Sequence, residues 1–129
     1  MNKLDKKSIL GISALLVHAA NIDEIYSDHE KELILSFIKS YLNDGQANEI
    51  LNEAEEVEKN SNQLLNYTNI IKENSMEVKK DIMEHLWKVI ISDNTVDQYE
   101  SNLMRRICGL IYFPDKESAE IKLKLLNEK

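Results

Sequence analysis

One short acidic pattern occurs twice in this chain, 70 residues apart, and it constrains the fold more than any other feature. The copies span residues 23–30 and 93–100, and in each an Asp stands seven residues before a Glu. A residue able to cap a helix, Ser27 or Asp97, stands three positions before that Glu. Apolar runs with helical spacing precede and follow both copies. The chain is therefore predicted to be a duplicated helix–acidic loop–helix unit.

The rest of the sequence extends this pattern to an all-α fold of about seven helices. Gly and Pro are scarce, with three and one respectively, and the β-branched alternation typical of strands is missing. We expect one domain over residues 1–129, with pseudo-symmetric halves at about 5–44 and 75–127 that helices 3 and 4 join. The helices are expected at about 5–21, from 27, at 46–60, at 63–72, after 75, after 97 and after 115, with the first and fifth at the centre.

Capping residues mark the ends of several of these helices. Ser27 and Glu30 form an S-x-x-E capping box. Asn43-Asp44-Gly45 is a helix stop, in which Gly45 can take a positive φ. Asp115, after the only proline, is predicted to cap the last helix. That helix is expected to bury three apolar residues, Ala119, Leu123 and Leu126.

Composition narrows the classes of function. The net charge of −7 argues against nucleic-acid binding, because phosphate neutralisation needs surplus Lys and Arg. The single cysteine excludes an internal disulfide and fits a reducing compartment. The apolar run at 9–17 is too short to span a bilayer, and its counterpart at 83–91 leads into the second acidic loop, which favours a helix over a signal peptide. We therefore expect a cytoplasmic protein without a membrane span.

The acidic loops offer oxygen ligands for a hard cation such as calcium, magnesium or manganese. The residues that the patterns place together as candidate metal ligands are Asp23, Glu30, Asp93, Asp97 and Glu100. A structural interpretation competes and is favoured on the residues alone. Glu30 and Glu100 can complete capping boxes, and the leading Asp of each copy can shape the turn after a helix.

Two charged segments could contact a partner. The segment 44–59 contains six acids and one base, so the third helix carries an acidic face that is either solvated or bound by a cationic partner. Arg105 and Arg106 have no acid three or four positions away. They either pair over a long range, with helix 3 or an acidic loop, or bind an anion.

No pattern typical of an enzyme is found. The three histidines lack metal-ligand spacing, although His29 lies beside the first acidic loop. The chain has no Gly-rich phosphate loop and no nucleophile motif. Cys108 lies on an apolar stripe and is expected in the core, as is Trp87. The sequence therefore predicts a protein that is not an enzyme.

The repeated pattern resembles the TerB-like family of bacterial tellurite-resistance operons, in its short stand-alone branch. The family pattern is an apolar helix, Ala-Asp-Gly-x-apolar-x-x-x-Glu and another helix, written twice. The matching stretches are 15–42 and 85–126, notably 86–89, Asp93, Glu100, 103–107 and Lys122. The resemblance implies the all-α fold and a divalent-cation role for Asp23, Glu30, Asp93 and Glu100. The glycine of the pattern is replaced by Glu24 and Asn94.

The sequence thus predicts a TerB-type module of a stress response that binds a divalent cation, a protein partner through acidic helix 3, or both. The alternative is a structural scaffold or dimerisation domain with no ion site. A homo-oligomer is compatible with either interpretation.

Overall fold

The computed structural model describes residues 6–21, 27–42, 44–60, 64–91 and 98–127, and within these ranges the chain forms seven α-helices and no strand. The all-α fold predicted from the sequence is confirmed. No helix among the described residues is both long and apolar enough to cross a membrane. The helices are α1 (Lys6–Ala20), α2 (Asp28–Lys39), α3 (Asp44–Asn60), α4 (Leu64–Lys72), α5 (Met76–Ile91), α6 (Gln98–Ile111) and α7 (Asp115–Asn127).

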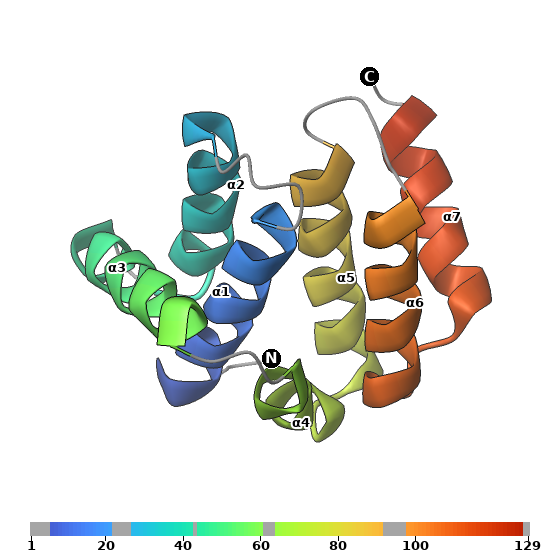
Figure 1. Ribbon diagram of the computed structural model, residues 1–129, viewed down its shortest axis with the longest axis horizontal. Helices are drawn as coiled ribbons and strands as arrows, with labels where there is room; N and C mark the ends of the chain where they lie inside the picture. Colours follow the sequence, from blue (N-terminus) through green and yellow to red (C-terminus); the bar gives the residue numbers. More distant parts are fainter. Residues whose placement is uncertain (1–5, 22–26, 43, 61–63, 92–97, 128–129) are drawn as a thin grey trace.

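Helix α1 is the centre of the fold and packs against α2, α3, α4 and α5 (Figure 1). Every residue from Gly11 to Val17 is buried, because a helix that is apolar on most sides must be covered on most sides. The contact with α4 is close at Gly11. A Cβ atom at this position would lie 2.5 Å from Cδ1 of Ile70, so glycine permits the close approach of α4.

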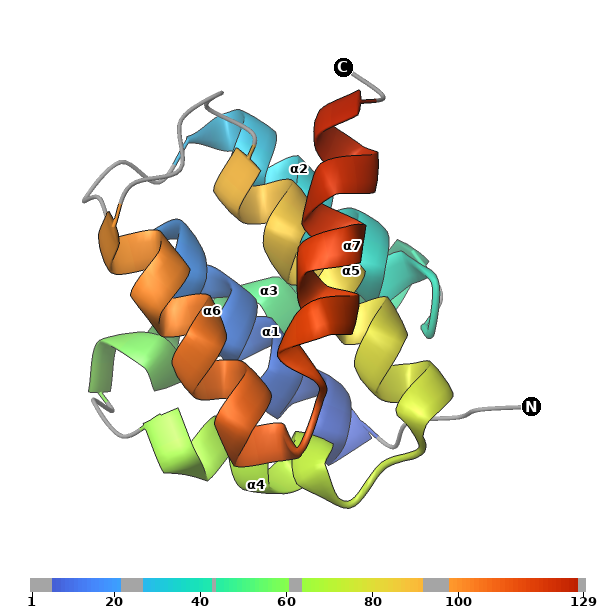
Figure 2. The ribbon, with the colours of Figure 1, turned by 90° about the vertical axis from the view of Figure 1, so that its right-hand side faces the viewer.

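Helix α5 is the second central element and packs against α1, α2 and α7 (Figures 1 and 2). Leu16 and Leu86, which occupy equivalent positions in the two sequence copies, are both fully buried. The helix starts keep the spacing of the acidic pattern, since α1 and α5 begin at 6 and 76, and α2 and α6 begin at 28 and 98. Helices α3 and α7 begin at 44 and 115, so their starts are separated by one residue more than the repeat spacing of 70. The proposed boundaries of the two halves stay a prediction.

The stop predicted at residues 43–45 is wrong, because α2 ends earlier without a glycine. The last residue of α2 is Lys39, and Gly45 lies in the first turn of α3 without a positive φ. Ser40 is the C-cap, and its hydroxyl donates to the Phe37 carbonyl at 2.6 Å. The Leu42 N–H donates to the Ile38 carbonyl at 2.8 Å. These bonds satisfy carbonyls at the end of the helix, which is the usual task of a C-cap glycine.

Helix α6 ends in a Schellman-type turn at Tyr112, which has a φ of 59°. The Phe113 N–H donates to the Cys108 carbonyl at 2.9 Å, and the Phe113 side chain is buried. Pro114 directly precedes α7, and its carbonyl accepts the Ser118 N–H of the first helical turn. Asp115 is the first residue of α7 rather than its cap. At this position its negative charge still stabilises the N-terminal end of the helix.

The apolar face predicted for α7 is also wrong. Ala119 is exposed, and Leu123 and Leu126 are 59% and 39% exposed. The buried residues of α7 are Ser118 and Ile121 instead. The helix is turned by about one residue, roughly 100°, relative to the predicted stripe. The buried side of α7 is the side that packs on α5, where the Trp87 indole N–H donates to Ser118.

Candidate functional sites

Most of the predicted cation ligands lie outside the described residues. Asp23, Asp93 and Asp97 fall in the ranges 22–26 and 92–97, and Glu100 lies in α6 but its side chain is not described. Only Glu30 can be placed. Among the side chains that the structure describes, no group of three or more His, Cys, Asp or Glu residues could hold a metal ion. Cation binding at the acidic loops therefore stays a prediction.

Glu30 is buried, with 5% of its surface exposed, in the first turn of α2. Its Oε1 accepts the Ser27 backbone N–H at 2.8 Å and the Ser27 hydroxyl at 3.1 Å. In return, the Ser27 Oγ accepts the Glu30 N–H at 3.2 Å. The predicted capping box is confirmed, and it satisfies N–H groups that the first helical turn leaves without partners. This role of Glu30 is structural and requires no ion.

Helix α3 is divided into an apolar and an acidic face. Ala47, Ile50, Leu51 and Ala54 are buried, whereas Glu49, Glu53 and Glu56 are exposed. These three carboxylates form no ion pair with a basic side chain in the described part of the chain. We call Glu49, Glu53 and Glu56 the acidic face of α3.

Another carboxylate of α3, that of Glu58, is taken up within the fold. Its Oε1 lies 3.4 Å from Nδ1 of His18, and the Asn21 amide donates to its Oε2 at 3.4 Å. Glu58 thereby ties α3 to the end of α1, which is a structural use of an acid. The carboxylates of the acidic face have no such bond to any side chain that the structure describes.

The predicted pairing of Arg105 and Arg106 with helix 3 is not found. Both side chains are exposed on α6, and neither forms an ion pair with a described acid. Helix α3 lies on the far side of the molecule from α6, with α1 and α5 between them (Figure 1). Pairing with an acidic loop falls outside the described residues. The two arginines are therefore available to an anion as far as the described residues are concerned.

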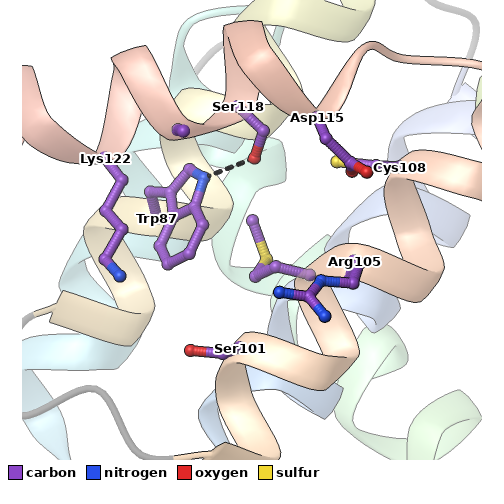
Figure 3. A pocket seen from close by; sticks show the side chains of 9 residues that line it. Trp87, Ser101, Arg105, Cys108, Asp115, Ser118 and Lys122 are labelled. Atoms are coloured by element: carbon purple, nitrogen blue, oxygen red, sulfur yellow. Dashed lines mark hydrogen bonds between the residues drawn. The ribbon is translucent and has the colours of Figure 1, made fainter.

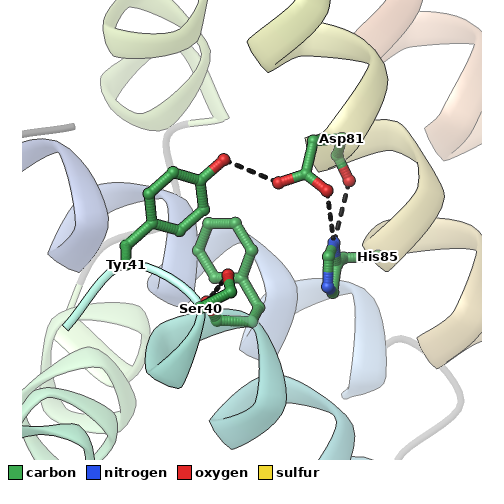
Figure 4. Close-up of polar contacts among 5 residues, drawn as sticks. Ser40, Tyr41, Asp81 and His85 are labelled. Carbon is green, nitrogen blue, oxygen red and sulfur yellow. Dashed lines mark hydrogen bonds and ion pairs between the residues drawn. The ribbon is translucent and has the colours of Figure 1, made fainter. Parts of the chain in front are cut away.

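A polar cluster links the end of α2 to α5 (Figure 4). The Tyr41 hydroxyl donates to Oδ2 of Asp81 at 2.6 Å, and Nδ1 of His85 lies 2.8 Å from the Asp81 carbonyl oxygen. The Phe37 ring contacts both rings, with centroids 5.2 Å from Tyr41 and 5.1 Å from His85. Burial, together with the bond to Asp81, raises the pKa of Tyr41 well above its ordinary value of 10.0. The hydroxyl therefore stays protonated and acts as a structural donor.

A pocket of about 490 Å³ opens between α5, α6 and α7 (Figure 3). One wall is Trp87, whose indole N–H donates to the Ser118 hydroxyl at 3.0 Å. The Lys122 ammonium lies 5.4 Å from the centroid of the Trp87 ring system, within the range of a cation–π contact. The other lining residues are Ser101, Met104, Arg105, Cys108, Asp115 and Ala119.

The cysteine of this pocket is buried, in surroundings that disfavour its thiolate. Cys108 is 2% exposed, and burial raises the pKa of its thiol. A nucleophilic cysteine needs the thiolate, so a protonated and buried Cys108 serves as an apolar wall. Its predicted place in the core is confirmed.

Sequence reasoning did not bring the pocket residues together. It placed Trp87 in the core, and Lys122 entered only through the family resemblance. One signal was available in the sequence. Like the two arginines of α6, Lys122 has no acid at the neighbouring helical positions 118, 119, 125 and 126.

Comparison with protein families supplies the context for these sites. The family described as "Tellurite resistance protein TerB" matches residues 10–123 of the 129-residue chain. Comparison with curated proteins and with solved structures gave no match. The matched range runs from α1 into α7 and includes both acidic loops. It also includes every residue named above as lining the pocket between α5, α6 and α7, which we call the Trp87 pocket. The chain therefore belongs to the TerB family of tellurite resistance proteins.

Proposed function

We propose that this chain is a non-enzymatic, cytoplasmic binding module of a tellurite-resistance-type stress response, and that it binds a basic partner protein through the acidic face of α3. Membership of the TerB family supports the stress context. The exposure of Glu49, Glu53 and Glu56, without a described basic neighbour, carries the proposal of a partner.

The spacing of these carboxylates favours binding over simple solvation. Glu49 and Glu53 are four residues apart, and Glu53 and Glu56 are three apart, so each pair costs the helix a few tenths of a kcal/mol. A basic partner would convert this repulsion into attraction. Because the opposite face of α3 is packed on α1 and α2, the carboxylates are presented on a fixed backbone.

Charge neutralisation tests this proposal. We expect a variant with Glu49→Gln, Glu53→Gln and Glu56→Gln to keep the fold and to lose partners that the wild-type protein captures from a bacterial lysate. The matched control removes three exposed carboxylates elsewhere, through Glu32→Gln, Glu73→Gln and Glu120→Gln. The control should capture the wild-type set. Equal capture by wild type and both variants would refute a partner on α3.

The proposal includes a divalent cation at the acidic loops, and this part rests on the sequence and the family resemblance. The alternative function, a scaffold or dimerisation domain without an ion site, is supported by the exposed Leu123 and Leu126 on α7. Sedimentation velocity with Leu123→Glu separates the two functions. A dimer that this substitution dissociates would favour the scaffold, whereas a monomer unaffected by it would favour the binding module.

A further inference from the structure

We propose that the pocket between α5, α6 and α7 binds a small aromatic oxyanion, meaning a planar apolar molecule that carries one carboxylate or phosphate group. The size and walls of the pocket, its two cations and its single carboxylate each limit the chemistry of the ligand. The inference does not depend on the partner proposed for α3, which lies on the other side of the molecule.

The size and walls of the pocket suit a small organic molecule. Ligand pockets of proteins commonly enclose about 300–1,000 Å³ and combine apolar walls with a few polar groups. This pocket measures about 490 Å³. Ala119 is exposed on its wall, whereas Trp87, Met104 and Cys108 border it with only 2–4% of their surface exposed. The Trp87 indole is fixed by its bond to Ser118 and is 4% exposed, so the ring of a ligand can contact only the small part of the indole that borders the pocket.

Two cations give the pocket its preference for an anion. Arg105 comes from α6 and Lys122 from α7, and neither has an acidic partner among the described residues. Figure 3 shows both side chains directed toward the space beside Trp87 and Ser101. An oxyanion between them would accept charge-assisted hydrogen bonds from both.

Asp115 limits how much negative charge the pocket accepts. Among the described residues it is the only acid of the lining, and Figure 3 places it beside Cys108, away from Lys122. Two cations and one carboxylate leave this described lining with one surplus positive charge. This balance favours a ligand with a single oxyanion over a polyphosphate. It also places the anionic group at the Lys122 side of the pocket, and the remainder of the ligand toward Cys108.

The position of Trp87 provides a direct assay, because it is the only tryptophan of the chain. The probes are benzoate and phenyl phosphate, with benzyl alcohol as the neutral analogue and inorganic phosphate as the anion without a ring. We expect benzoate or phenyl phosphate to change Trp87 emission saturably, with Kd on the order of 1 mM for molecules of this size. The two arms distinguish a carboxylate from a phosphate ligand. Weak, non-saturating responses to benzyl alcohol and inorganic phosphate should accompany this result.

Three single variants test the role of the cations. Arg105→Gln and Lys122→Gln should each weaken binding of the better probe by about threefold to tenfold, since one charge-assisted bond is lost. Arg106→Gln is the matched control, because Arg106 neighbours Arg105 on α6 but does not line this pocket. It should leave Kd within about twofold at the same ionic strength. Calorimetry repeats the measurement, because Lys122→Gln also changes the surroundings of Trp87.

Three outcomes would overturn the proposal. Benzyl alcohol that binds as tightly as benzoate would show an apolar pocket without anion preference. An equal loss for Arg106→Gln and Arg105→Gln would show a diffuse effect of charge. The absence of saturation with both aromatic probes, in a wild-type protein that unfolds cooperatively, would show that no such site exists.

Discussion

Three hydrogen bonds of the capping box of α2 predict how much stability is lost when the Ser27 hydroxyl is removed. Ser27→Ala removes the hydroxyl that accepts the Glu30 N–H at 3.2 Å and donates to the Glu30 carboxylate at 3.1 Å. The bond from the Ser27 N–H to the same carboxylate, at 2.8 Å, is retained. The substitution therefore breaks one half of a reciprocal pair and leaves the other half in place.

The expected cost lies in the upper part of the range for helix caps. Replacing an N-cap serine by alanine costs about 0.5–2 kcal/mol, because a helix-start N–H loses its partner. Water can replace a lost partner only where it has access, and Glu30 is 5% exposed. A buried group without its partner is more costly than an exposed one. We therefore expect Ser27→Ala to lower the free energy of unfolding by about 1–2 kcal/mol.

Urea denaturation followed by circular dichroism measures this loss. Ser40→Ala is the control, since it makes the same substitution at the other end of α2, where an exposed hydroxyl donates to the Phe37 carbonyl. Water can replace that donor, so the control should cost less than about 0.5 kcal/mol. The slope of free energy against urea should stay constant in both variants. Equal midpoints for Ser27→Ala and Ser40→Ala would refute the capping argument.

The remaining predictions concern Tyr41 and the cation. The raised pKa of Tyr41 means that its neutral hydroxyl stabilises the fold below its ordinary pKa of 10.0 and that this stabilisation is lost as pH rises further. Urea midpoints of wild type should therefore fall more steeply above that pH than those of Tyr41→Phe, and parallel curves would contradict this. If the acidic loops bind calcium, magnesium or manganese, millimolar ion should raise the melting temperature. The double substitution Asp93→Asn and Glu100→Gln should abolish this rise, whereas Asp23→Asn should reduce it less. If none of the three ions changes the melting temperature of the wild-type protein, the result favours the scaffold interpretation.

Helix positions and the core were predictable because they depend on local periodicity and on apolar residues. The stripes of α1 and α5 are long, and few turn residues interrupt them, so the sequence locates these two helices without tertiary information. The capping box was predictable for a similar reason, since all of its groups lie within four residues. The helix starts at 28 and 98 also follow from the repeated pattern.

Features that depend on contacts distant in sequence were not predictable. The apolar side of α7 was assigned from Ala119, Leu123 and Leu126, but the side that packs on α5 carries Ser118, which bonds to Trp87, 31 residues away. The pocket has the same origin, because it requires Trp87 on α5, Arg105 on α6 and residues of α7 to meet. The spacing of residues within any one helix does not predict that these three helices come together.

The two sequence copies form hollows with different linings in equivalent places. Trp87 and Ser101, which line the Trp87 pocket, correspond to Val17 and Lys31 at the repeat spacing of 70 residues. Val17 and Lys31 line a second hollow, of about 310 Å³, to which α3 contributes Glu55, Glu56, Glu58 and Lys59. Among the described residues, the first hollow contains three acids and two bases, and the second contains Arg105, Lys122 and Asp115 beside an aromatic wall. The equivalent helices also pack differently, since α2 packs on α1 and α3 whereas α6 packs chiefly on α4. The sequence repeat therefore does not determine the lining of either hollow, because side chains of α3 and α7, which differ, complete each one.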